Sequence, residues 1–75
     1  LAKDVEIYYN NENLIVSENN HEFNKLFLYD ISGRLLFESD FQNITPIGKF
    51  KSGIYVVNLH NSKTIFSKKI YISFY

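Results

Sequence analysis

The sequence predicts an all-β fold in which about seven short strands form a sandwich of two antiparallel sheets. Apolar and polar side chains alternate along short segments, which is the pattern of strands with one buried face. Turn-forming residues separate these segments every ~8–12 residues, and no stretch has helical periodicity long enough to compete. The abundance of Ile, Tyr, Phe and Val also favours strands over helices. A partly open barrel is the alternative arrangement of the same strands.

Four strands are predicted in the first half of the chain, over residues 4–9, 14–17, 23–29 and 34–40. Asparagines in residues 10–13 suit a chain reversal, because Asn tolerates positive φ. The run from Asp30 to Gly33 predicts a tight hairpin, in which Gly33 supplies the left-handed residue of a type I turn with a bulge. The alternation pairs Val5 with Ile7, Leu14 with Val16 and Leu26 with Leu28 on shared faces, and it places Leu36 inward with Leu35 and Phe37 on the opposite face.

Two further strands are predicted over residues 54–60 and 64–74, with a turn at residues 61–63 between them. Residues 41–50 are the least regular part of the chain. Pro46 has no backbone donor, so this part is expected to be an edge strand or a bulged crossing. Shared faces are expected for Tyr55, Val57 and Leu59 in one strand and for Phe66, Ile70, Ile72 and Phe74 in the other.

Six Tyr and seven Phe, with no cysteine, indicate a fold held together by a dense core rather than by disulfides. A chain of 75 residues suits one domain. Because so small a domain needs large buried side chains, we favour core positions for four alternating aromatic residues, Phe27, Tyr29, Phe37 and Tyr71. The alternative is an exposed platform that binds sugars, bases or a partner by stacking.

The chain begins with Leu1 rather than Met, and we therefore interpret residues 1–75 as a single domain cut from a larger protein. Eight basic and eight acidic residues give a formal net charge of zero, which argues against a nucleic-acid partner. No apolar run approaches the ~18 residues of a membrane helix, and no signal peptide is visible.

The sequence holds no constellation typical of an enzyme, and we predict no catalytic residue and no cofactor. No serine lies in a nucleophile motif, and the three glycines are too isolated to build a phosphate cradle. His21 and His60 lie in separate segments without the spacing of a metal site. Glu18 and Glu22 flank His21, but calcium loops need several oxygen ligands at fixed spacing, so we predict no metal site here.

Lys68 and Lys69 form a basic pair near the end of the chain. The preferred interpretation is that they protect an edge strand from unwanted pairing. The alternative is a contact with an acidic partner.

Three pieces of sequence occur in order: VEIY from Val5, LFLYDISGR from Leu26, and GIYVVNL from Gly53, followed by Lys69-Ile70. In this order the chain resembles the type A C-terminal sorting domain of the type IX secretion system, from about residue 4 to residue 72. The family usually has Pro-Asn-Pro after the first of these pieces, where this chain has Tyr9-Asn10-Asn11.

The resemblance implies an Ig-like sandwich that acts as an address label rather than as an enzyme. It implies a covalently attached N-terminal cargo, transit through the periplasm of a Gram-negative bacterium, and recognition by the outer-membrane type IX translocon. It also implies that a sortase-like protease cuts near Leu1 to Lys3, or upstream, and joins the cargo to the cell surface. The positions linked to recognition are Gly33, Arg34, Gly53, Tyr55, Lys69 and Ile70.

One alternative function is an Ig-like or fibronectin-like accessory or adhesion module of a surface protein, with glycans as its ligand. Such a module would stay on the mature protein, whereas a sorting label is lost. A weak homodimer through an edge strand is a further expectation for the isolated domain.

Overall fold

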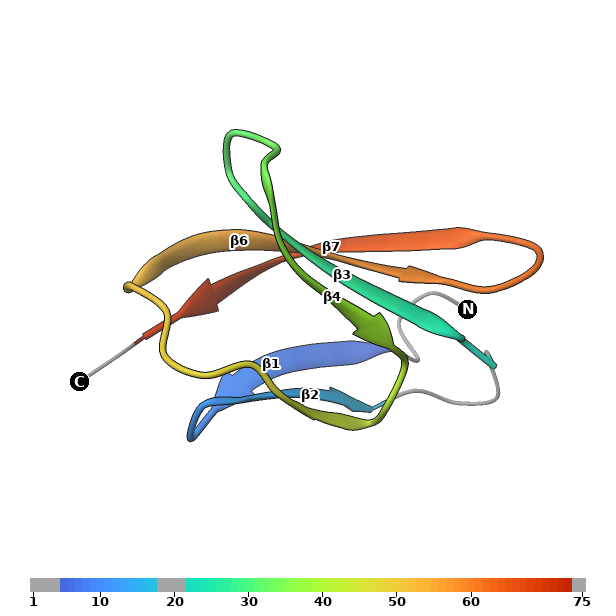
Figure 1. The fold of residues 1–75 in the computed structure, drawn as a ribbon, viewed down its shortest axis with the longest axis horizontal. Helices are drawn as coiled ribbons and strands as arrows, with labels where there is room; N and C mark the ends of the chain where they lie inside the picture. The colour runs from blue at the N-terminus through green and yellow to red at the C-terminus, as the bar shows by residue number, and fades with distance from the viewer. Residues whose placement is uncertain (1–4, 18–21, 74–75) are drawn as a thin grey trace.

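The computed structural model describes residues 5–17 and 22–73, which form seven strands in two antiparallel sheets without a helix (Figure 1). The three-stranded sheet has the order β1 (Glu6–Asn10), β2 (Asn13–Ser17) and β5 (Ile44–Pro46). The four-stranded sheet has the order β4 (Leu35–Asp40), β3 (Lys25–Asp30), β6 (Gly53–His60) and β7 (Ile65–Ile72). The two sheets form two layers, so the predicted sandwich is confirmed and the barrel is not.

The β1–β2 hairpin turns through two residues that both have positive φ, Asn11 at 55° and Glu12 at 66°. Two left-handed residues in succession define a type I′ turn, whose twist matches that of the strands on either side. Asn10 pairs with Asn13 across this turn, and Ile7 pairs with Val16 further along. The turn predicted from the asparagines is therefore confirmed.

Alternating side chains from both sheets make one buried core. The three-stranded sheet contributes Ile7, Leu14 and Val16, and the four-stranded sheet contributes Leu26, Leu28, Val57, Leu59, Ile70 and Ile72, with Val5 and Phe23 just outside the strands. Leu26 lies opposite Leu59, and Leu28 lies opposite Val57, with all four side chains fully buried. Each fully buried side chain of this size contributes about 1.5–3 kcal/mol, which is the main favourable term for so small a sandwich.

Strand β4 contains a bulge that the alternation did not predict. Leu28 pairs with Phe37 but Tyr29 pairs with Leu35, so Leu36 has no partner in the ladder. One extra residue reverses the order of faces beyond it. Phe37 therefore packs against the core, and the prediction that Leu36 points inward while Leu35 and Phe37 share a face is wrong.

Strand β5 is a short edge strand, as Pro46 predicted. It pairs only with β2, where Pro46 lies opposite Asn13. Beyond it, the amides of Ile47 and Gly48 donate to the carbonyl of Glu12 at 3.0 and 3.1 Å, and the Tyr9 hydroxyl donates to the Gly48 carbonyl at 2.7 Å. These bonds tie the irregular crossing to the three-stranded sheet before the chain returns to the other layer as β6.

Candidate recognition surface

The β3–β4 hairpin is organised by one carboxylate. Asp30 Oδ1 accepts hydrogen bonds from the Ser32 amide at 3.0 Å, the Ser32 hydroxyl at 2.6 Å and the Arg34 amide at 2.9 Å. Hydrogen bonding by the Ser32 hydroxyl, and then by the Arg34 amide, lowers the pKa of Asp30 below its ordinary value. Gly33 has a φ of 93° and donates to the Asp30 carbonyl at 3.0 Å, which confirms the predicted hairpin.

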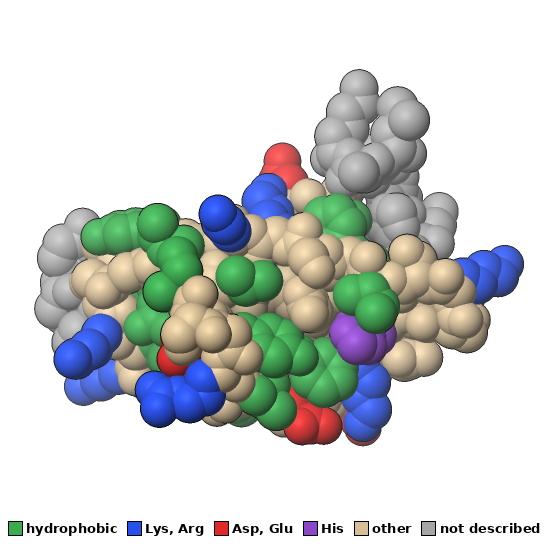
Figure 2. Space-filling model, turned by 90° about the horizontal axis from the view of Figure 1, so that it is seen from above, with side chains coloured by type: hydrophobic (Ala, Val, Ile, Leu, Met, Phe, Trp, Pro, Cys, Tyr) green, Lys and Arg blue, Asp and Glu red, His purple; other side chains and the backbone are tan. Residues whose placement is uncertain are grey.

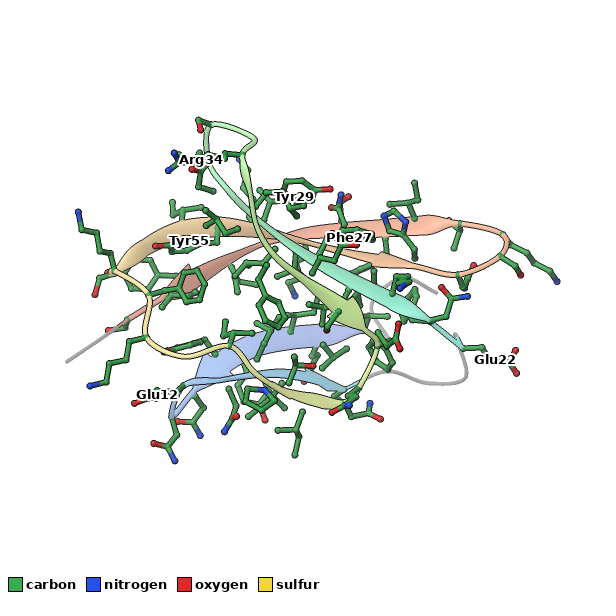
Figure 3. The ribbon with its side chains drawn as sticks, in the orientation of Figure 1. Glu12, Glu22, Phe27, Tyr29, Arg34 and Tyr55 are labelled. Carbon is green, nitrogen blue, oxygen red and sulfur yellow. The ribbon has the colours of Figure 1, made fainter. Side chains whose placement is uncertain are left out.

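Arg34 leaves this hairpin as an exposed cation. Its Nε lies 3.3 Å from Asp30 Oδ2, and 77% of the side chain remains exposed. Figure 3 shows Arg34 at the hairpin that projects from the four-stranded sheet. The local hydrogen bonds therefore fix the backbone under this side chain and leave its charge available to a partner.

Tyr55 connects the middle piece of the resemblance, its own piece from Gly53, and the Lys69-Ile70 pair. It lies opposite Asp30 of β3 on one side and opposite Ile70 of β7 on the other. Its ring is partly buried and packs edge-on against Phe50, with the centroids 5.7 Å apart, while its hydroxyl donates to the Lys51 carbonyl at 2.8 Å. Tyr55 thus anchors the start of β6 rather than presenting a free side chain.

The other predicted positions lie in the same part of the sheet with different exposures. Gly53 begins β6 opposite Ile72, and an added Cβ there would lie 3.9 Å from the Tyr55 ring. Ile70 is buried in the core, whereas Lys69 is exposed and lies opposite Val56. The six predicted positions therefore lie in the half of the sheet nearer the β3–β4 hairpin, but only Gly33, Arg34 and Lys69 are exposed.

One surface of the four-stranded sheet points away from the three-stranded sheet. This surface, the outer face, carries several aromatic and aliphatic side chains. Its cross-strand rows, in the order β4, β3, β6, β7, are Asp40–Lys25–His60–Ile65, Glu38–Phe27–Asn58–Ser67 and Leu35–Tyr29–Val56–Lys69, followed by the pair Ile54–Tyr71. Figure 2 looks onto this face and shows hydrophobic side chains gathered across it. Leu35, Ile54, Ile65 and Tyr71 are 45%, 47%, 60% and 64% exposed.

The core interpretation of the four aromatic residues is therefore correct only for Phe37. Phe27 and Tyr29 stack on the outer face with their centroids 6.4 Å apart, and Tyr71 lies near the far edge of the same face. Period-two alternation assigns Phe27 and Tyr29 to the face opposite Leu26 and Leu28. It does not reveal that, among residues 5–17 and 22–73, no further layer covers them.

The remaining sequence candidates have no site around them in the described part of the chain. Glu18, His21, Phe74 and the expected cleavage region from Leu1 to Lys3 lie outside the described residues, and Glu22 is exposed. The His60 ring packs on Phe27 at 4.5 Å. Within residues 5–17 and 22–73, no group of three or more acidic or histidine side chains could hold a metal ion. In the same ranges, no helix is long and apolar enough to cross a membrane.

A comparison with the profiles of known protein families shows which family the chain belongs to. Over residues 4–73 the chain matches the profile of the family described as "Secretion system C-terminal sorting domain". The chain is a member of this sorting-domain family. The match spans all seven strands and both pieces that carry the resemblance in the middle and end of the chain. No curated protein sequence matches the chain closely enough to count as a relative.

The sorting domain is a C-terminal signal for the type IX secretion system. It is attached to an N-terminal cargo and recognised by the type IX machinery, which exports the cargo through the outer membrane to the cell surface or the medium. The family is not an enzyme family. The sorting function is therefore favoured over the accessory or adhesion module.

Proposed function

We propose that the type IX machinery recognises the sorting domain at the end of the four-stranded sheet where the β3–β4 hairpin, the start of β6 and the end of β7 meet. The observation that supports this location is the row Asp30–Tyr55–Ile70, because this pairing places three segments that are separate in sequence on adjacent strands. Pieces that are distant in sequence but adjacent in the fold are what a receptor for the folded domain can read.

The six positions then divide into two roles. Arg34 and Lys69 present exposed positive charge, and Gly33 sets the backbone that carries Arg34. The other three positions support the two strands below these exposed side chains: Gly53 and Tyr55 lie in β6, and Ile70 lies in β7. A receptor with acidic side chains and backbone carbonyls at its contact surface fits this charge, because guanidinium and ammonium groups donate and do not accept hydrogen bonds.

The route of the cargo follows from this role. We propose that residues 1–75 form one domain at the end of a larger secreted protein and carry no catalytic activity. The domain would cross the periplasm of a Gram-negative bacterium, engage the outer-membrane translocon and then be removed by a sortase-like protease that attaches the cargo to the cell surface. Passage through the periplasm is supported by the export step, because a signal read at the outer membrane must reach it from the inner side.

The test is to fuse the 75 residues to a fluorescent cargo and measure the exported fraction in cells that contain or lack the type IX system. Arg34→Ala and Lys69→Ala together should reduce the exported fraction by about fivefold or more, which corresponds to the loss of charged contacts at an interface. The matched control is Lys63→Ala, which removes an exposed cation from the β6–β7 turn at the other end of the same sheet.

Circular dichroism and thermal unfolding of the purified fusions separate recognition from folding. The double variant should keep the unfolding temperature of the parent, since both side chains are exposed. Normal export of the folded double variant would refute the proposed location, and an equal loss with Lys63→Ala would show that overall charge, not this end of the sheet, is read.

A further inference from the structure

The outer face has no partner within the described part of the chain. The three-stranded sheet covers only the opposite side of the four-stranded sheet, as Figure 1 shows. Exposed apolar area of this kind favours association, because contact with water costs free energy in proportion to the area. The rows of the outer face therefore point to an interaction surface, and their charges indicate what it binds.

Opposite charges lie at opposite edges of the outer face. Glu38 and Asp40 belong to β4, and Lys69 belongs to β7. Lys25 Nζ donates a hydrogen bond to Asp40 Oδ1 at 2.9 Å within the same chain. This hydrogen bond, together with the negative charge of Asp40, raises the pKa of Lys25. The outer face thus has one acidic edge at Glu38 and one basic edge at Lys69, both exposed.

Pairing through the edges of the sheet is disfavoured by the same charges. Strand β7 carries Lys68 and Lys69 at its centre, and β4 carries Glu38 and Asp40. Two copies joined β7 to β7, or β4 to β4, would bring like charges together, which is how natural sheets protect their edges. The edge-strand homodimer expected from the sequence is therefore the less favourable arrangement.

We propose that the outer face binds a second copy of this chain about a two-fold axis that lies between the two faces and runs along the strands. This rotation places β4 of each copy over β7 of the other and β3 over β6, and it keeps the rows in order. Glu38 then lies over Ser67 of the second copy, and Lys69 is the next outward residue, ~7 Å further along β7. Symmetry repeats the contact, so two pairs of opposite charge flank the shared apolar centre.

The other in-plane axis, which runs across the strands, gives a poorer match. It places β7 over β7 and β4 over β4, so the Lys69 side chains of the two copies come within ~7 Å of each other at one edge. Glu38 then lies over Leu35 of the second copy rather than near a cation. Charge complementarity therefore selects the axis along the strands.

The size of the outer face sets the strength of the dimer. The strands lie ~4.8 Å apart and are six residues long in β3 and β4 and eight in β6 and β7, so at ~3.4 Å per residue they cover about 450 Å² on each copy. The two copies together bury about 900 Å², which is just below the ~1,000 Å² that a stable specific interface exceeds. The dimer is therefore weak and depends on concentration.

The test is sedimentation velocity of the 75-residue chain between about 10 µM and about 1 mM, the range in which an interface of this size associates. The parent chain should pass from monomer to dimer. Glu38→Lys and Lys69→Glu should each weaken self-association about tenfold or more, because each places like charges at both contacts. Lys63→Glu makes the same change of charge in the β6–β7 turn, and it should leave the dissociation constant of the dimer within about twofold of the parent value.

An equimolar mixture of Glu38→Lys and Lys69→Glu chains provides the decisive measurement. In the proposed symmetry each mixed pair regains two opposite-charge contacts, so the mixture should form heterodimers with about the affinity of the parent. Val56→Lys, at the centre of the face, should abolish association in a chain whose circular dichroism is unchanged. A parent chain that stays monomeric, a mixture that does not associate, or a series of larger oligomers would each overturn the proposal.

Discussion

Asp30 holds both the backbone and the side chain of Arg34: Oδ1 accepts the Arg34 amide at 2.9 Å, and Oδ2 lies 3.3 Å from the Arg34 Nε. A single carboxylate thus fixes where the exposed guanidinium leaves the hairpin. All of its partners come from the next four residues, so the geometry of this loop is local and does not depend on the opposite sheet.

The first prediction concerns pH. The hydrogen bonds from Ser32 and Arg34 hold the pKa of Asp30 below its ordinary value of 3.8, so the folded state favours the ionised form. Asp30→Asn keeps Oδ1 but removes the charge, and it should lower the free energy of unfolding at neutral pH. The difference between the two chains should be constant above pH 3.8, shrink as the pH falls through the lower folded-state pKa, and vanish below it.

Urea unfolding at several values from neutral pH down to about pH 2 measures this difference directly. A difference that stays the same across the whole range would show that the charge of Asp30 does not stabilise the hairpin.

The second prediction concerns Gly33. Its φ of 93° lies in the left-handed region, and nothing lies within 4 Å of the place where a Cβ would be. Gly33→Ala should therefore cost about 1–2 kcal/mol through backbone strain alone. Gly33→Asn should cost less, because Asn visits positive φ more readily. Equal losses for the two variants in urea unfolding would indicate a steric cause instead.

The third prediction tests the bulge in β4. Phe37 packs against the core, whereas Leu36 has no partner in the ladder. Phe37→Ala should lower the free energy of unfolding by about 2–3 kcal/mol, which is below the value for a fully buried Phe because the ring is partly exposed. Leu36→Ala should cost less than half as much. The reverse order in chemical unfolding would contradict the register described for this strand.

Alternation in the sequence was enough to predict the strands and most of the core. Leu14, Leu26 and Leu28 are buried because each lies at an alternate position of its strand, on the face that points toward the other sheet. The turn at Gly33 could also be predicted from the sequence, since few residues other than glycine adopt its φ. These features depend on the local sequence, and local sequence is what the alternation reports.

Features that depend on distant parts of the chain could not be predicted in this way. The bulge at Leu36 follows from the pairing with β3. The exposure of Tyr71 follows from its position on the outer face, which no other described strand covers. The juxtaposition of Asp30, Tyr55 and Ile70 likewise requires the strand order. For the candidate surface, the sequence therefore indicated the residues, and the sheet topology is needed to show which of them are exposed together.

The pairing of β7 along the whole length of β6 has a consequence for protein synthesis. Every residue from Gly53 to His60 has its partner between Ile65 and Ile72, and Ile70 and Ile72 close the core. Ribosomes deliver these residues after all the other strands. A chain that terminates early therefore lacks both the last strand and part of the hydrophobic interior. A completely folded domain therefore requires that translation has reached at least its final strand, and we expect incomplete products to lack a folded export signal.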